Sequence, residues 1–236
     1  TAGLPLALSR LVSQAAAQGP RNSQRRIFRT ALALLAIVGL VCSAVMCLFP
    51  RLLSGLLHDS LAAPAIRTLG PAVLFVCLSS AIRGYTQGLG DMTPTAVSQV
   101  TESGGKLVVG LALCLALLHR GASSAQCAAG AIAGVTAGSL LSLAVLAVLL
   151  LRRRDTAPAA DTPPQRGTVL RALLTAGIPI TLGAAGMSLI TLLDQALVMT
   201  TLQNTLGYTE ETATALYGEY TFGMTLFALP PSFIYP

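Results

Sequence analysis

The chain has 236 residues, of which 53% are hydrophobic and 10% charged, and it contains no tryptophan. Its formal net charge is +6 and its mean hydropathy is +0.71. A soluble domain needs more polar surface than this, so the composition excludes an ordinary water-soluble protein and indicates a membrane protein.

Apolar windows long enough to cross a bilayer recur along the chain. About 20 apolar residues span a hydrocarbon core of roughly 30 Å. We predict such spans, in chain order, at residues 31–49, 70–89, 95–118, 127–151 and 172–202. Residues 1–17 and 217–236 have the character of incomplete spans. We therefore expect an all-α polytopic membrane protein, and we interpret the sequence as a piece of a longer chain.

The segments between the spans predict how the chain is organised. Residues 50–68 are too broken to span, but their leucines recur at helical spacing, which favours a short helix on the outer membrane surface. The stretch RRRDTAPAADTPPQRG is rich in proline, alanine and charge, as a flexible linker is. We expect two membrane units, 1–151 and 169–236, joined by a cytoplasmic linker at 152–168.

Arginines are concentrated in alternate loops, which predicts the orientation. The loop 18–29 and the linker 152–171 carry nine basic residues between them, whereas the intervening loops carry only Arg51, Arg67 and Arg120 and then the acidic stretch GYTEETATALYGE. Basic residues near span ends are retained on the cytoplasmic side. The net charge therefore indicates topology in a bilayer, and no nucleic-acid partner is expected because the arginines lie in separate loops.

A polar stripe lies inside the predicted span 95–118. Its members fall within an arc of roughly 100° on a helix, and they are Gln99, Glu102, Ser103, Lys106 and Gly110. With the cytoplasmic end near Thr95, Glu102 lies about 10 Å deep and Lys106 about 16 Å deep. The pair either lines a cavity, with Lys106 attracting an anion and Glu102 tuning or gating it, or forms an internal ion pair between helices.

The span 70–89 carries a second stripe. Ser79 or Ser80, Arg83 and Gln87 follow one another at helical spacing, and Asp91 comes in the next turn. Arg83 could clamp a phosphate through its fork of donors. The alternative is that it reaches the nearby interface or pairs with Asp91.

Two further charged residues are candidates for function. Asp194 is a lone acid in an apolar span, so it is either a proton- or sodium-coupling carboxylate or a solvated residue at the outer interface. Arg10 faces either the cavity or the inner leaflet. The cysteines show no Cys-x-x-Cys spacing and the histidines no cluster, so we predict no disulfide, no metal site and no cofactor.

Small residues recur in two places. Gly130, Gly134 and Gly138 stand at four-residue spacing, which favours close packing of two helices. Gly104 and Gly105 fit either close packing or a flexible point beside the charged stripe. No strand precedes these glycines, so they do not form a nucleotide-binding loop.

Four motifs carry a family resemblance, namely GLPLALSRLVSQ, RGYTQGLGDMTPTAVSQVTESGGKLVVGLAL, AGAIAGVTAGSLLSL and LYGEYTFGMTLFALPPSFIYP. They resemble the stage V sporulation protein B branch of the polysaccharide transporters, which are relatives of the lipid II flippases within the multidrug/oligosaccharidyl-lipid/polysaccharide exporter superfamily. The likeness runs along most of the chain. It departs at ESGG, residues 102–105, where larger residues are expected before the basic one.

The resemblance implies a fold and a function. The chain would form the N-terminal six-helix lobe, lacking its first helix, and the start of a second lobe, with a central cavity between the two lobes. It would move a lipid-linked sugar pyrophosphate across the bacterial cytoplasmic membrane by alternating access and would not be an enzyme. A cation-coupled multidrug exporter of the same fold and a non-transporting membrane scaffold remain as alternatives.

Overall fold

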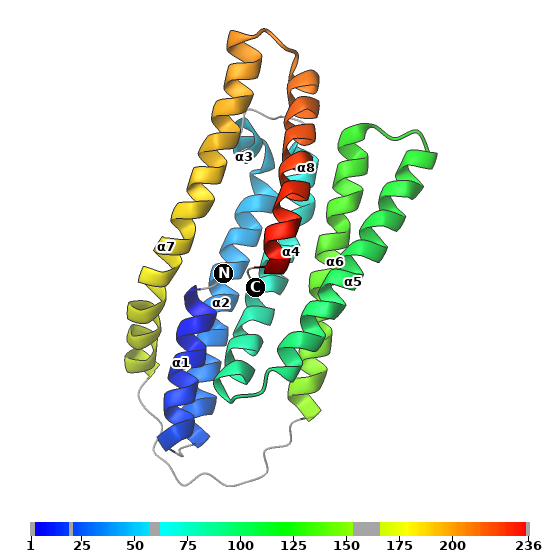
Figure 1. Ribbon diagram of the computed structural model, residues 1–236. Helices are drawn as coiled ribbons and strands as arrows, with labels where there is room; N and C mark the ends of the chain where they lie inside the picture. The colour runs from blue at the N-terminus through cyan, green and yellow to red at the C-terminus, as the bar shows by residue number, and fades with distance from the viewer. Residues whose placement is uncertain (1–2, 19–20, 57–61, 153–165, 235–236) are drawn as a thin grey trace.

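Long helices make up the described part of the chain, as the composition predicts (Figure 1). The computed structural model describes residues 3–18, 21–56, 62–152 and 166–234. Within these ranges every regular element is helical. The all-α class expected from the sequence is therefore confirmed.

Five helices are long and apolar enough to cross a membrane among the described residues. They are α2 (Arg21–Leu48), α4 (Ala63–Gly88), α5 (Thr93–His119), α6 (Ser124–Arg152) and α7 (Arg166–Thr200), the last continued by the π-helical turn η2 (Thr201–Thr205). Each contains most of one of the five spans that hydropathy predicts. The other described helices are α1 (Gly3–Gln18), α3 (Pro50–Leu56) and α8 (Glu210–Ile234).

Several helices extend beyond their apolar windows, which corrects the predicted loops. Helix α2 begins at Arg21, so the basic segment predicted as a loop forms its first turns. Helix α8 begins at Glu210, so most of the acidic segment is also helical. Arginine and glutamate are good helix formers, and carboxylates in a first turn suit the positive end of the helix dipole. Hydropathy detects only the apolar part of such a helix.

The segment 50–68 is also more helical than predicted. Its first part forms the expected short helix, α3, and its last residues already belong to α4. The position of α3 on the outer membrane surface stays a prediction. The linker between the two predicted units falls largely on residues 153–165, which lie outside the described residues, so the division into units also stays a prediction.

Arginines gather at one end of the bundle. Figure 1 shows the end of α1, the α4–α5 turn and the end of α6 at its lower edge, together with the starts of α2 and α7. We call this the basic end, after Arg25, Arg26, Arg29, Arg152 and Arg166. The α5–α6 turn and the α7–α8 connection lie at the opposite end. This alternation agrees with the orientation predicted from the loop charges.

A hydrophobic core near the basic end joins four helices. Leu8 and Val12 of α1 pack with Ile27 of α2, Tyr85 of α4 and Leu173 of α7, and all five side chains are buried. Helix α7 therefore packs against α1 and α2 mainly through its N-terminal part. Most residues from Leu182 to Leu197 on the same helix are exposed.

Glycines set the close approach of α5 and α6. A Cβ added to Gly105 would lie 2.9 Å from the Cα of Gly138, and one added to Gly110 would lie 2.8 Å from the carbonyl oxygen of Ala131. The small-residue packing predicted for α6 is thus confirmed. It also accounts for the small residue at 105, since Gly105 is part of this contact. Gly104 has open space around it.

Candidate functional site

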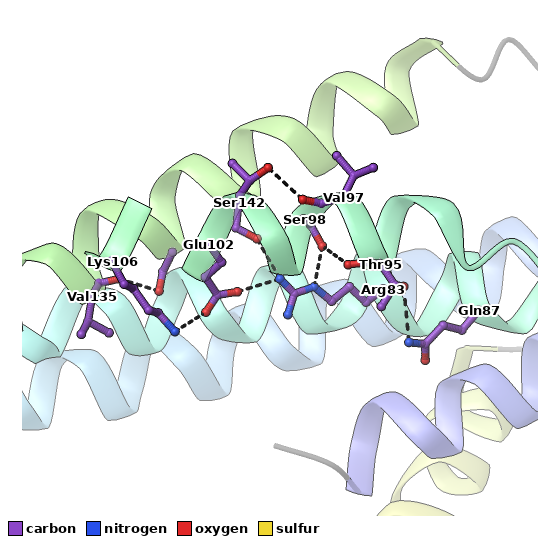
Figure 2. A network of polar contacts seen from close by, with 11 residues as sticks. Arg83, Gln87, Thr95, Val97, Ser98, Glu102, Lys106, Val135 and Ser142 are labelled. Atoms are coloured by element: carbon purple, nitrogen blue, oxygen red, sulfur yellow. Dashed lines mark hydrogen bonds and ion pairs between the residues drawn. The ribbon is translucent and has the colours of Figure 1, made fainter. Parts of the chain in front are cut away.

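A carboxylate joins two cations in the middle of the bundle (Figure 2). The Nζ of Lys106 donates a hydrogen bond to Glu102 Oε1 at 2.7 Å, and Nη2 of Arg83 donates one to Glu102 Oε2 at 2.7 Å. Lys106 and Glu102 share helix α5, one turn apart, whereas Arg83 comes from α4. The two charged stripes predicted from sequence therefore meet at Glu102.

Serine hydroxyls hold the arginine in place. Arg83 Nε donates to Ser98 Oγ at 2.9 Å, and Nη2 also donates to Ser142 Oγ of α6 at 2.8 Å. Both serines are fully buried. Ser98 in turn donates to the carbonyl oxygen of Thr95 at 2.9 Å. The guanidinium thus ties α4, α5 and α6 together at one point, as Figure 2 shows.

The charges of this network do not cancel. Two cations, Arg83 and Lys106, share one carboxylate, which leaves one positive charge in excess. The side chains of Arg83 and Glu102 are only 16% and 12% exposed, but that of Lys106 is 38% exposed. The surplus charge is therefore presented on the lysine side of the network, where it can attract an anion.

The depth of the network makes its charges costly. Lys106 is the middle residue of the 27-residue helix α5 and lies about 20 Å from the start of that helix. A charge at the centre of a spanning helix costs about 2.5 to 3.5 kcal/mol on insertion scales. Mutual pairing and hydrogen bonds offset part of that cost for Glu102 and Arg83. Within the described part of the chain, Lys106 pairs with Glu102 alone and is the most exposed of the three charged side chains, so its charge is the least compensated by the protein.

The predicted stripe on α5 is divided between two faces. Gly110 is buried against Ala131 and Gly134 of α6, whereas Gln99 and Ser103 are exposed and take no part in the network. An arc of about 100° is wide enough to include both edges of a packed face. The α4 side of α5 is lined by Ser98 and Glu102, which excludes Gln99 from the network.

The stripe on α4 is also partly revised. The partners of Arg83 are Glu102, Ser98 and Ser142, so the alternatives of pairing with Asp91 and of reaching the interface are wrong. Gln87 lies one turn further along and donates from Nε2 to Thr95 Oγ1 at 3.3 Å. It therefore extends the network toward the basic end.

The two remaining candidates lie elsewhere. Arg10 is exposed on α1, whose opposite face packs through Leu8 and Val12. Asp194 is exposed on α7, which contacts α1, α2, η2 and α8. Neither residue joins the charged network, and the roles predicted for them stay predictions.

Sequence reasoning missed the polar residues that complete the network. Thr95 and Ser98 precede Glu102 and Lys106 at spacings of three and four residues, so the pattern on α5 contains a signal for them. Ser142 has no such signal, because it lies on a different helix. Its role follows only from the packing of α6 against α4.

Five membrane-length helices, three of them joined by a buried charged network, define a multi-pass membrane protein built around an internal polar site. The chain belongs to the polysaccharide biosynthesis protein family, which matches residues 1–236. The family resemblance seen in the sequence motifs is thereby confirmed.

The similar proteins are bacterial. The chain is 30% identical to stage V sporulation protein B of Bacillus subtilis (strain 168) over 98% of this chain and 45% of that protein. It is 27% identical to the uncharacterized membrane protein YabM of the same organism, over 97% of this chain and 42% of that protein. It is 30% identical to the lipid II flippase MurJ of the same organism, over 43% of this chain and 20% of that protein.

These comparisons place the chain among bacterial multi-pass membrane proteins, as predicted. The chain spans a little under half the length of the first two relatives. No solved structure matches it significantly.

Proposed function

We propose that the chain is part of a transporter that moves a lipid-linked sugar pyrophosphate across the cytoplasmic membrane by alternating access, without enzymatic chemistry. The observation that carries this proposal is the surplus positive charge of the network, presented by Lys106 at the middle of a spanning helix. An anionic head group crossing the hydrocarbon core needs such a charge, while its lipid tails remain in the membrane.

The three charged residues have separate roles in this proposal. Lys106 contacts the pyrophosphate, because it is the most exposed of the three. Glu102 positions Lys106 through their ion pair. Arg83 positions Glu102, since its guanidinium is occupied by Glu102, Ser98 and Ser142. This assignment replaces the phosphate clamp expected of Arg83 from sequence.

The wider architecture follows the family. Helices α1 to α6 belong to an N-terminal lobe, α7 and α8 belong to a second lobe, and the segment between α6 and α7 is the cytoplasmic linker between them. This division is proposed because the chain belongs to the family along its whole length.

Coupling to H+ or Na+ is assigned to Asp194. Its carboxylate lies in a membrane-length helix and is exposed, and it belongs to the proposed second lobe. Replacing it with asparagine removes the titratable and cation-binding group. Transport by that variant is expected to lose its dependence on the proton or sodium gradient, and an unchanged dependence contradicts the assignment.

Charge separates this function from a multidrug exporter of the same fold. A cation exporter needs acids facing its cargo, whereas the network carries two cations for one acid. The surplus favours an anionic cargo. A non-transporting scaffold needs no exposed charge at Lys106. The transport experiment below, in which Lys106 is replaced, therefore distinguishes a transporter from a scaffold.

The test uses the protein at the full length its gene encodes, in cells depleted of their own lipid II flippase. We expect it to restore exposure of lipid II at the outer surface. Lys106→Ala should abolish this rescue, whereas Val108→Ala, on the exposed side of α5, should not. Absence of rescue by the parent protein, at normal expression and membrane insertion, contradicts lipid II as the cargo. Full rescue by Lys106→Ala contradicts the role of the lysine.

A further inference from the structure

A second polar feature lies at the basic end, on other helices than the charged network. A groove with a volume of about 500 Å³ runs between the start of α2 and the start of α7. It is lined by Arg26, Arg29, Thr30, Ala33, Leu34 and Ile37 of α2 and by Arg166, Gly167 and Leu170 of α7. The proposed function does not use it.

The lining is ordered along the helix axis. The α2 residues recur at spacings of three and four, so they share one face of that helix. The arginines lie at the basic end of this face, and the apolar side chains lie further into the predicted span. Arg26 and Ile37 are separated by about 16 Å along the axis. This is close to half of a hydrocarbon core of roughly 30 Å, the depth of one leaflet.

The polar end of the groove is strongly cationic. Among the described residues, its lining contains three arginines and no carboxylate. The Nε of Arg26 is buried and is one of the few buried side-chain nitrogen or oxygen atoms in the described part of the chain that lack a hydrogen-bond partner. A neighbouring cavity of about 310 Å³ shares Arg26 and Arg29 and is completed by Asn22 and Arg25. Donors for a phosphate are therefore in place on both sides of Arg26.

We propose that this groove binds an anionic phospholipid of the inner leaflet. The phosphate accepts hydrogen bonds from Arg26, Arg29 and Arg166, and one acyl chain lies along Leu34, Ile37 and Leu170. Arginine is suited to phosphate because its planar fork offers paired donors. A buried guanidinium N–H without a partner is costly, and a phosphate oxygen removes that cost.

The shape of the groove selects a lipid over other occupants. A soluble phosphate would leave the apolar wall uncovered, and an apolar helix would leave the arginines without counter-charges. A phospholipid covers the apolar wall with an acyl chain and supplies the counter-charge to the arginines with its phosphate. Because its walls come from α2 and α7, the bound lipid also bridges the two proposed lobes next to the core contact of Leu173. This lipid is therefore a resident component and not the transported cargo.

The test measures lipid binding to the detergent-purified full-length protein by native mass spectrometry. The probes are phosphatidylglycerol, phosphatidylcholine and inorganic phosphate. We expect a retained phosphatidylglycerol adduct at least tenfold stronger than that of phosphatidylcholine, and no displacement by inorganic phosphate. Displacement by inorganic phosphate would reassign the site to a free anion and overturn the lipid.

Matched variants assign the adduct to the groove. Arg29→Gln with Arg166→Gln should weaken phosphatidylglycerol binding at least tenfold. Arg152→Gln with Arg171→Gln removes two arginines near the same end that do not line the groove, and it should leave binding unchanged. Equal losses in both pairs would indicate general surface charge and overturn the proposal.

A filling variant keeps the arginines and closes the groove. Ala33→Trp places a large ring on the apolar wall, and it should lower phosphatidylglycerol binding while leaving the charges intact. Unchanged binding in both this variant and Arg29→Gln with Arg166→Gln overturns the site. Absence of any adduct on the parent protein also overturns it, because another segment of the full-length chain then covers the groove. Each readout is independent of transport, so the proposed function can fail while the lipid site stands.

Discussion

Gly138 of α6 lies directly against the backbone of Lys106 on α5. A Cβ added to Gly138 would stand 2.8 Å from the Lys106 amide nitrogen, 2.8 Å from its Cγ and 2.6 Å from the carbonyl oxygen of Glu102. The turn that carries the Glu102–Lys106 ion pair therefore rests on a glycine of the neighbouring helix. The position of the lysine depends on the absence of a side chain there.

A side chain at residue 138 should separate α5 from α6. We expect Gly138→Val to lower the free energy of unfolding by about 1 to 3 kcal/mol, the usual range for overpacking, and to reduce transport by displacing Lys106. Gly104→Val is the matched control on α5, because no described atom beyond its own stretch of helix lies within 4 Å of the position its Cβ would take. Thermal unfolding in detergent measures the stability of both variants. Equal tolerance of the two substitutions would show that the close contact does not position the pair.

Breaking the ion pair from the α4 side should cost stability. Arg83→Leu leaves Ser98, Ser142 and one oxygen of Glu102 without their donor. We expect a loss of about 2 to 3 kcal/mol, at or below the low end of the range for a broken buried pair, because Lys106 still neutralises Glu102.

A double-mutant cycle isolates the interaction itself. Combining Arg83→Leu with Glu102→Ala should reveal a coupling energy of about 0.5 to 3 kcal/mol. Combining Arg83→Leu with Leu111→Ala, a residue that is 56% exposed on α5, should give additive effects. Urea unfolding of the detergent-solubilised protein supplies the values. Additivity in the first pair would mean that the 2.7 Å contact contributes nothing measurable.

Water should reach residue 106 and not its lipid-facing neighbours. In a background without the native cysteines, we expect Lys106→Cys to react with a charged thiol reagent, because apolar surroundings disfavour the reactive thiolate and exclude a charged reagent. Ser142→Cys, which is fully buried, and Val108→Cys, which is 66% exposed on the apolar surface, should remain unmodified. Mass spectrometry of the labelled protein checks this. Equal modification of all three cysteines would contradict the prediction that water reaches residue 106 selectively.

The two tight turns should lie on opposite sides of the membrane. Gly90, with φ +81°, lies between α4 and α5, and Gly121, with φ +72°, lies between α5 and α6. The arginine distribution predicts that a reporter inserted after Gly90 is cytoplasmic and one inserted after Gly121 is external. Enzymatic reporters active on only one side provide the measurement. A reversed result would invert the proposed orientation.

Hydropathy located all five candidate spans, because apolar length is a property of the sequence alone. It misplaced helix ends at Arg21 and Glu210, since charged residues that favour helices continue the backbone hydrogen bonding past the apolar region. Glycine spacing on α6 likewise predicted its close packing. That packing needs only small side chains on one face, which a single sequence reveals.

The charged network was predictable only in part. Helical spacing places Glu102 beside Lys106, but which edge of α5 faces α4 is fixed by packing. The spacing therefore favours Gln99, whereas packing puts Ser98 in the network. The contact of Arg83 with Ser142 joins residues 59 positions apart. No pattern within one helix can indicate such a contact.

Lys106 is the single lysine in these 236 residues. An amine-selective reagent that enters from water therefore has one side-chain target in this region, at the middle of α5. Since its Nζ is held by Glu102 at 2.7 Å, its rate of acylation reports how often that ion pair opens. The same residue that presents the surplus charge thus serves as a built-in chemical probe of its own site.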